Sequence, residues 1–306
     1  MTDVITVESL TKRYDEVTAV DDISFSVTEG EIFGILGPNG AGKTTTLECI
    51  EGLVEPSAGS ISVLGMDIAR DAEPIKRRIG VQLQASAYFD YLTLREILDL
   101  FAMIYGCRAS ADDLLATVDL QDRADTTVSK LSGGQQQRFA IAATLVNDPE
   151  IVFLDEPTAG LDPQARRDLW QLVQSMNDGG RTIVVTTHYM EEAEFLCDRV
   201  AIMDLGRIVA LDTPGALVRS LPTPFQITIE LKDSSRPDGL DSLAAVTQVV
   251  AGPDGSVILH SSDSAATIPA LMNWLSLTGS VITRLEVNTR NLEDVFLALT
   301  GRGLQE

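Results

Sequence analysis

The chain has 306 residues, of which 44% are hydrophobic, so it can bury the core of one large domain or two smaller ones and is too apolar to be disordered. Its net charge is −22 and no basic tract stands out, which argues against binding to a nucleic-acid backbone or to anionic lipid. An acidic, lysine-poor composition fits either a salt adaptation or a GC-rich genome that favours arginine codons.

Neither a leader nor a membrane segment is expected. Residues 1–10 are acidic and alternating rather than basic and then apolar, so we predict no signal peptide. No stretch has the unbroken apolar length that crosses a bilayer. The three cysteines, Cys49, Cys107 and Cys197, lie far apart without metal-type spacing, which favours reduced thiols in a cytosolic protein.

A glycine-rich loop between a predicted strand and a predicted helix is the most informative local pattern. The apolar run Ile32–Leu36 indicates a buried strand, residues 37–45 fit G-x-x-x-x-G-K-[ST], and Thr44–Leu53 is predicted as the helix. Such a loop points successive backbone N–H groups at an anion, and the helix N-terminus adds positive potential. We expect Lys43 to reach the β- and γ-phosphates of a nucleotide and the Thr44 hydroxyl to hold Mg²⁺. The loop residues predicted to bind the nucleotide are Pro38, Asn39, Gly40, Ala41, Gly42, Lys43, Thr44 and Thr45.

Apolar runs and helical patterns alternate through residues 1–220, which is typical of an α/β domain with a mostly parallel sheet. Further strands are predicted at Ile79–Leu83, Ile151–Leu154, Thr182–Thr186 and Arg199–Asp204. Residues 85–145 instead look mainly helical, with helices at Leu94–Tyr105 and Gln135–Val146. This block is predicted to be an inserted helical subdomain.

Two carboxylates follow the apolar strand Ile151–Leu154 directly. Open α/β sheets bind their ligands at the carboxyl ends of parallel strands, where Asp155 and Glu156 would lie. Asp155 is expected to hold Mg²⁺, directly or through water. Glu156 is expected to polarise the attacking water as a catalytic residue.

A second anion cradle is predicted at residues 131–138, with the sequence Leu-Ser-Gly-Gly-Gln-Gln-Gln-Arg. Ser132 and Gln135 form a capping-box pattern at a helix start, and Gly133 and Gly134 expose backbone N–H groups there. The chain then has two phosphate-type sites and only one complete nucleotide site. Two chains arranged head to tail would resolve this, each offering its Ser-Gly-Gly segment to the γ-phosphate held by the other.

Residues 221–306 are predicted to form a small α+β accessory domain. Two prolines in Leu221–Pro224 indicate a linker. The strand and helix patterns that follow are Phe225–Leu231, Val246–Ala251, Ser256–His260, Ala265–Leu277, Val281–Val287 and Leu292–Leu299.

Over roughly the first 220 residues the chain resembles the ATP-binding subunit of an ATP-binding cassette (ABC) transporter. Leu131–Gln135 matches the family signature LSGGQ, the glycine-rich loop matches Walker A, and Ile151–Pro157 matches Walker B. The resemblance implies a P-loop cassette that binds ATP and Mg²⁺ and hydrolyses ATP, with Lys43 and Glu156 in catalysis.

The resemblance also assigns four residues outside these motifs. Tyr14 matches the aromatic residue that stacks on adenine, and Gln84 matches the glutamine that senses Mg²⁺ and the membrane partner, although Gln82 lies two residues away and Leu83 stands where proline is common. Asp162 matches the D-loop aspartate. His188 follows a predicted strand and matches the switch histidine that contacts the γ-phosphate, which makes it the third catalytic residue.

The C-terminal sequences Asp212–Leu217 and Asn291–Gly301 are similar to those of ATPases from ABC-2 type exporters, including drug-resistance and nodulation-signal systems. This resemblance implies an exporter ATPase that dimerises on binding ATP. It also implies a peripheral position on the cytoplasmic face of the membrane, through a separate permease that docks near Ala85–Leu94. The alternatives are an importer ATPase with a regulatory tail and a cassette ATPase that is not linked to transport.

Overall fold

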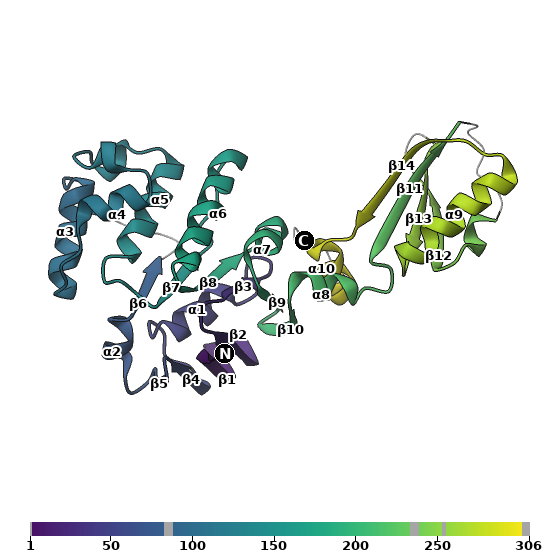
Figure 1. Cartoon of the computed structure of the whole chain (residues 1–306). Coiled ribbons are helices and arrows are strands. Elements are labelled where there is room, and N and C mark those ends of the chain that lie inside the picture. The colour runs from purple at the N-terminus through teal and green to yellow at the C-terminus, as the bar shows by residue number, and fades with distance from the viewer. Residues whose placement is uncertain (1, 83–87, 233–238, 253–254, 302–306) are drawn as a thin grey trace. The chain divides into compact units, whose positions relative to one another are not determined.

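The structure is a computed structural model that describes residues 2–82, 88–232, 239–252 and 255–301 (Figure 1). The chain divides after Thr213 into two compact units. No helix within the described ranges combines the length and the apolar composition needed to cross a membrane.

The first unit is built on a six-stranded sheet with the order β10-β9-β3-β8-β7-β6. Its strands are β3 (Ile32–Leu36), β6 (Ile79–Gln82), β7 (Ile151–Asp155), β8 (Thr182–Thr187), β9 (Arg199–Asp204) and β10 (Arg207–Asp212). All neighbours are parallel except β10, which pairs with β9 in the antiparallel sense. Strands β3, β7 and β8 are buried at every position, as expected for central strands of a parallel sheet that is covered on both faces. The predicted α/β fold with a mostly parallel core sheet is confirmed.

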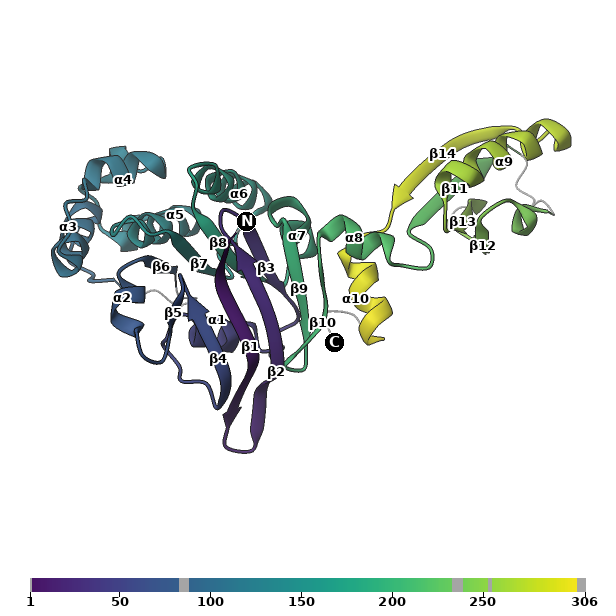
Figure 2. The ribbon, with the colours of Figure 1, turned by 60° about the horizontal axis from the view of Figure 1, so that its bottom comes forward.

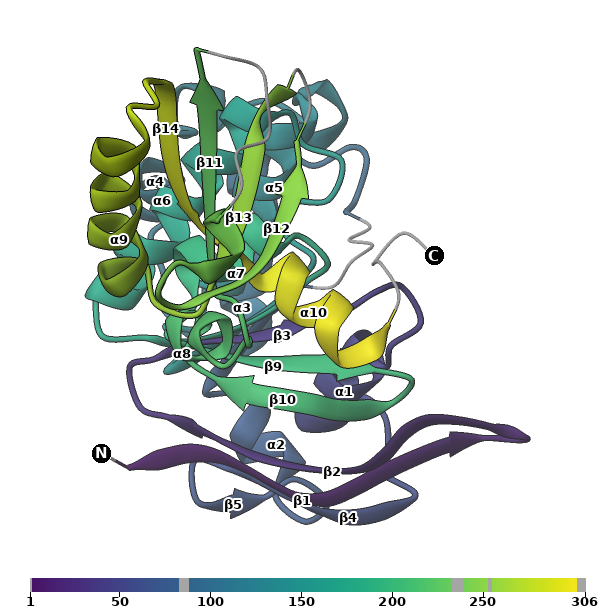
Figure 3. The same ribbon diagram turned by 90° about the vertical axis from the view of Figure 1, so that its right-hand side faces the viewer.

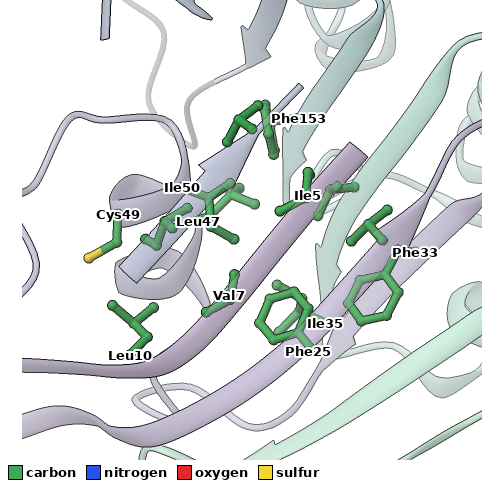
Figure 4. Packing of buried hydrophobic residues seen from close by; sticks show 14 of the residues in the cluster. Ile5, Val7, Leu10, Phe25, Phe33, Ile35, Leu47, Cys49, Ile50 and Phe153 are labelled. Carbon is green, nitrogen blue, oxygen red and sulfur yellow. The ribbon is translucent and has the colours of Figure 1, made fainter. Parts of the chain in front are cut away.

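A second, antiparallel sheet with the order β2-β1-β4-β5 completes the strands of this unit and was not predicted. Its strands are β1 (Asp3–Tyr14), β2 (Val17–Thr28), β4 (Ala58–Val63) and β5 (Met66–Asp67). In Figure 2 this sheet faces the viewer, with helix α1 (Lys43–Ile50) behind it. The main core lies where α1 packs between the two sheets (Figure 4), and in it the rings of Phe25 and Phe33 stack with their centroids 5.2 Å apart.

Besides α1, the described part of the first unit contains six α-helices. Their bounds are α2 (Ala72–Lys76), α3 (Leu94–Tyr105), α4 (Ala111–Thr117), α5 (Gly133–Thr144), α6 (Pro163–Asp178) and α7 (Met190–Leu196). Helices α3, α4 and α5 pack together beside β6 and make up the predicted helical block (Figure 1). Thr93 closes a capping box on α3, so the sequence itself fixes where that helix begins.

The second unit contains a four-stranded antiparallel sheet with the order β12-β13-β11-β14. Its elements are α8 (Pro214–Arg219), β11 (Phe225–Leu231), β12 (Val246–Ala251), β13 (Val257–Ser261), α9 (Ser264–Thr278), β14 (Ile282–Thr289) and α10 (Leu292–Thr300). Helix α9 lies along one face of the sheet (Figure 3), and apolar residues such as Ile227, Leu259 and Leu271 form the core between them. Helix α10 packs against α8.

A buried carboxyl group lies at the end of α1. Glu51 directly follows this helix and is 2% exposed, and its Oε1 atom has no hydrogen-bond partner among the described residues. Burial, with the negative charges of Asp155 and Glu48, raises the pKa of Glu51 to about 8. The side chain is therefore largely protonated in the folded chain at neutral pH.

We expect Glu51→Gln to raise the melting temperature at pH 8 by about 5 °C and to leave it nearly unchanged at pH 5. Between the ordinary pKa of 4.5 and the folded-state value of about 8, the folded chain holds a proton that the unfolded chain has lost. The wild-type free energy of unfolding therefore falls as pH rises through this window, whereas the neutral amide removes that loss. Thermal unfolding at both pH values tests this, with Glu55→Gln as the exposed control. Equal shifts for the two variants at pH 8 would contradict the assignment.

Candidate functional site

The glycine-rich loop connects β3 to α1, as predicted, and two of its glycines adopt backbone conformations that side chains disfavour. Gly40 has φ +80° and Gly42, the N-cap of α1, has φ +99°. A Cβ atom on Gly42 would lie 2.4 Å from the carbonyl oxygen of Ala19 in β2, whereas one on Gly40 would meet nothing within 4 Å. The loop is therefore held tightly against β2 at Gly42 and is open at Gly40.

Lys43 is 4% exposed, and its ammonium group is fully engaged within the chain. Its Nζ atom donates to the carbonyl oxygens of Gly37 at 2.9 Å and Pro38 at 3.1 Å, and lies 3.1 Å from Oε1 of Glu156. Three acceptors thus compensate a charge that would be costly to bury alone.

Glu156 connects the loop lysine to the predicted switch histidine. Its second carboxylate oxygen, Oε2, lies 3.1 Å from Nδ1 of His188, which follows β8 directly and is 30% exposed. Glu156 is 9% exposed and has φ +47°, which is rare for a residue with a side chain. Its backbone N–H donates to the carbonyl and the hydroxyl of Thr186, so pairing with β8 holds the residue in this conformation. The three predicted catalytic residues therefore lie in one contact chain.

Side-chain oxygen atoms of Thr44, Asp155 and Thr186 lie close together beside the loop. The Thr44 hydroxyl donates to Asp155 at 3.1 Å from Oδ2, and Asp155 also accepts a hydrogen bond from the Thr186 hydroxyl. Asp155 is 4% exposed at the end of β7. A hydroxyl and a carboxylate at this spacing suit a hard cation such as Mg²⁺.

Lys43, Thr44 and Glu156 border an open cleft of about 560 Å³, whereas Asp155 and His188, which contact Thr44 and Glu156, do not line it. Among the predicted residues, those that line the cleft are Asn39, Gly40, Gly42, Lys43, Thr44, Thr45 and Glu156. Five lining residues were not predicted: Val17, Thr18, Ala19, Leu205 and Gly206. The last two form the turn between β9 and β10 (Figure 3), where the Gly206 N–H donates to the Ala41 carbonyl at 3.0 Å. A leucine and a glycine between two apolar runs predict a turn but not its contact with the loop.

Tyr14 lies at the end of β1, is 43% exposed, and is not among the residues that line the cleft. Burial, together with the negative charge of Glu48, raises the pKa of Tyr14, and a hydrogen bond with Thr45 offsets part of this rise. The Lys12 ammonium lies 4.8 Å from the ring centroid. The ring is thus adjacent to the cleft through Thr45, which lines it.

The predicted capping box of α5 is present. Ser132 accepts from the Gln135 N–H, and Oε1 of Gln135 accepts from the Ser132 N–H at 3.0 Å. A Cβ atom on Gly133 would meet nothing within 4 Å, but one on Gly134 would lie 3.2 Å from Cβ of Ala165 in α6. Gly134 therefore allows close packing of two helices, and Gly133 leaves the backbone accessible. None of these four signature residues lines the cleft of its own chain.

The remaining predicted residues have different outcomes. Asp162 is exposed and caps α6, where its Oδ1 atom accepts from the N–H groups of Gln164 and Ala165 at 3.0 Å. Gln84 lies outside the described residues. Gln82 is 3% exposed and donates to Gln137 of α5 at 2.7 Å, so it is a buried link between β6 and the signature helix.

Comparisons with known proteins agree with this geometry. The pattern that defines the ABC transporter family matches residues 20–159. A Nod factor export ATP-binding protein I of Paraburkholderia xenovorans is 39% identical over 98% of this chain and 97% of its own length. A daunorubicin resistance ATP-binding protein of Streptomyces coeruleorubidus is 36% identical over 97% of this chain and 96% of its own.

Solved structures give the same result for the fold. The ATP-binding subunit of an ABC transporter is 32% identical, with a TM-score of 0.64 over 71% of this chain and 92% of that chain. A dimeric ATP-binding cassette in a post-hydrolysis state, bound to ADP and Pi, is 29% identical, with a TM-score of 0.62 over 68% of this chain and 98% of that chain. The phosphate loop, the acidic strand end and these full-length relatives lead to one conclusion: the chain belongs to the ABC transporter family and is one of its ATP-binding, ATP-hydrolysing subunits.

Proposed function

We propose that this chain powers an exporter by hydrolysing Mg·ATP between two copies of itself, arranged head to tail. The observation that carries the proposal is that the predicted catalytic residues lie together, whereas the predicted signature segment lies away from them. Lys43, Glu156 and His188 lie in contact beside the cleft, whereas the Ser132 segment does not line it. A second copy could bring its own Ser132 segment to the open side.

The residues at and beside the cleft supply the two things that phosphoryl transfer needs, which are groups that hold the phosphates and groups that activate water. Lys43 and the backbone N–H groups of the loop would hold the terminal phosphates, so that charge is neutralised and the phosphate is positioned. Glu156 would take the proton of the attacking water, and His188 would orient Glu156 and contact the γ-phosphate. Tyr14 would stack on adenine.

Mg²⁺ fits the oxygen atoms that Thr44 and Asp155 present, because this ion prefers hydroxyl, carboxylate and phosphate oxygens. Bound there, it would neutralise charge on the β- and γ-phosphates. Gln84 is proposed as a further ligand by its resemblance to the family glutamine.

The exporter assignment rests on two relatives that match nearly the whole chain and are named for Nod factor export and daunorubicin resistance. We propose that residues 1–220 form the ATPase domain and 221–306 an accessory domain, and that a separate permease holds the chain at the cytoplasmic face of the membrane. The transported molecule would be recognised by that permease.

Mixing two inactive variants tests the head-to-tail arrangement. Lys43→Met/Glu156→Gln removes both members of the buried ion pair and inactivates the chain's own cleft, while Ser132→Arg blocks the segment offered to the partner. We expect each variant alone to be inactive and a 1:1 mixture to recover about a quarter of the wild-type rate, because half of the dimers would contain one intact site. A mixture that stays inactive, although both variants form dimers with wild-type chain, would reject the arrangement.

A further inference from the structure

The first turn of α6 touches both the signature segment and the switch segment. Asp162 caps the helix. Ala165 faces Gly134 so closely that a Cβ atom on Gly134 would lie 3.2 Å from the Ala165 side chain. The next residue, Arg166, places its guanidinium carbon 4.1 Å from the ring centroid of Tyr189, beyond the end of β8. One turn of α6 therefore contacts the first turn of α5 and the residue before α7, which are far apart in sequence.

Tyr189 in turn lies against the switch histidine. The rings of His188 and Tyr189 have centroids 4.1 Å apart, and the Tyr189 N–H donates to the Thr187 hydroxyl at 2.9 Å. His188 then contacts Glu156 through Nδ1. A shift of the Tyr189 ring would therefore move His188 and, through it, the Glu156 carboxylate that is proposed to take the proton from water.

Within the part of the chain that the structure describes, no carboxylate forms an ion pair or hydrogen bond with the Arg166 guanidinium. Its Nε atom is buried without a hydrogen-bond partner among the described residues, and so is Oε2 of the nearby Glu192. Glu192 is instead held through Oε1, which accepts from the Thr158 hydroxyl and from the Trp170 indole, each at 2.9 Å. Burial raises the pKa of Glu192, and its hydrogen bonds, followed by the positive charge of Arg166, offset part of that rise. Stacking on Tyr189 is thus the contact that positions the guanidinium.

We propose that Arg166 is a positioning residue that, through Tyr189, couples the orientation of His188 in one cleft to the state of the signature segment on the same chain. The inference rests on the proposed function, in which that segment contacts the nucleotide of the partner copy. Because Ala165 and Arg166 are adjacent on one helical turn, movement of Gly134 against α6 is transmitted to the Tyr189 ring. Each chain would thereby link its own cleft to that of its partner.

The test compares Arg166→Ala with Arg167→Ala, which removes the same charge from the adjacent, exposed position. In the full-length chain we expect Arg166→Ala to lower kcat about tenfold and to bring the Hill coefficient for ATP toward one, with an unchanged Kd for ATP. Arg167→Ala should behave as wild type. Arg166→Lys keeps a cation over the ring and should retain activity within about threefold of wild type. Adding Arg166→Ala to Tyr189→Leu should cause little further loss, because Tyr189→Leu already removes the contact through which Arg166 acts.

Three outcomes would overturn the coupling. One is a wild-type kcat and Hill coefficient in Arg166→Ala. Another is an activity loss that follows a lowered melting temperature and that Arg166→Lys does not rescue. The third is additive losses in Arg166→Ala and Tyr189→Leu. His188→Ala, measured in parallel, separates this inference from the proposed function: normal hydrolysis there would reject the role of His188 and the coupling together, whereas its loss beside an unaffected Arg166→Ala would reject the coupling alone.

Discussion

Glu156→Gln is expected to lower ATP hydrolysis about a thousandfold while ATP still binds. The amide has the shape of the carboxylate and keeps a carbonyl oxygen for Lys43, which lies 3.1 Å from Glu156 in the wild-type chain. It cannot accept a proton from the attacking water. Without hydrolysis the ATP-bound dimer should accumulate. Single-turnover hydrolysis, binding of a fluorescent ATP analogue and light scattering measure these three effects.

The matched control for this variant is Glu191→Gln, an exposed change of the same kind in the first turn of α7, which should leave all three measurements unchanged. Hydrolysis at a rate near wild type in Glu156→Gln would mean that another group takes the proton. Loss of ATP binding would instead mean that the carboxylate mainly supports the loop.

Lys43→Met should abolish measurable ATP binding and also destabilise the ligand-free chain by about 3 kcal/mol. The substitution removes the cation that compensates Glu156, a side chain that is only 9% exposed. Adding Glu156→Gln in the same chain should restore most of the lost stability, because no unpaired buried charge then remains, but it should not restore binding. Denaturant unfolding and calorimetric ATP titration measure the two effects separately.

Lys130→Met, at an exposed position, is the control for loss of a lysine charge. If Lys43→Met lost ATP binding with no loss of stability, the ion pair with Glu156 would contribute nothing to the ligand-free fold. If Glu156→Gln failed to restore stability, the carbonyl oxygens of Gly37 and Pro38 would be the groups that need the cation.

The parts of the site that sequence could predict are those encoded by neighbouring residues. A glycine-rich loop between a buried strand and a helix specifies its own shape, and the capping box at Ser132 needs only a residue three positions later. The carboxylates after β7 follow from an unbroken apolar run. In each case the local pattern and the tertiary environment favour the same structure.

The missed parts depend on approaches between distant segments. Val17–Ala19 and the β9–β10 turn line the cleft only because β2 and the core sheet pack on either side of the loop. The antiparallel sheet of the first unit, β2-β1-β4-β5, was missed because register shifts interrupt the pairing of β1 with β2, and Ser9 and Asp22 have positive φ. These irregularities break the two-residue alternation by which a half-buried strand is recognised. Glu192 was missed because a glutamate on a short helix carries no sign of burial.

The ion pair between Lys43 and Glu156 has a consequence for the order of events at the cleft. The lysine Nζ lies 3.1 Å from Oε1 of Glu156, so it holds the carboxylate that is proposed to act as the base. A triphosphate bound at Lys43 would compete for the same ammonium group, and the Glu156 carboxylate would then be free to contact water. Binding of the substrate would then be the step that frees the base, so that hydrolysis would follow nucleotide binding.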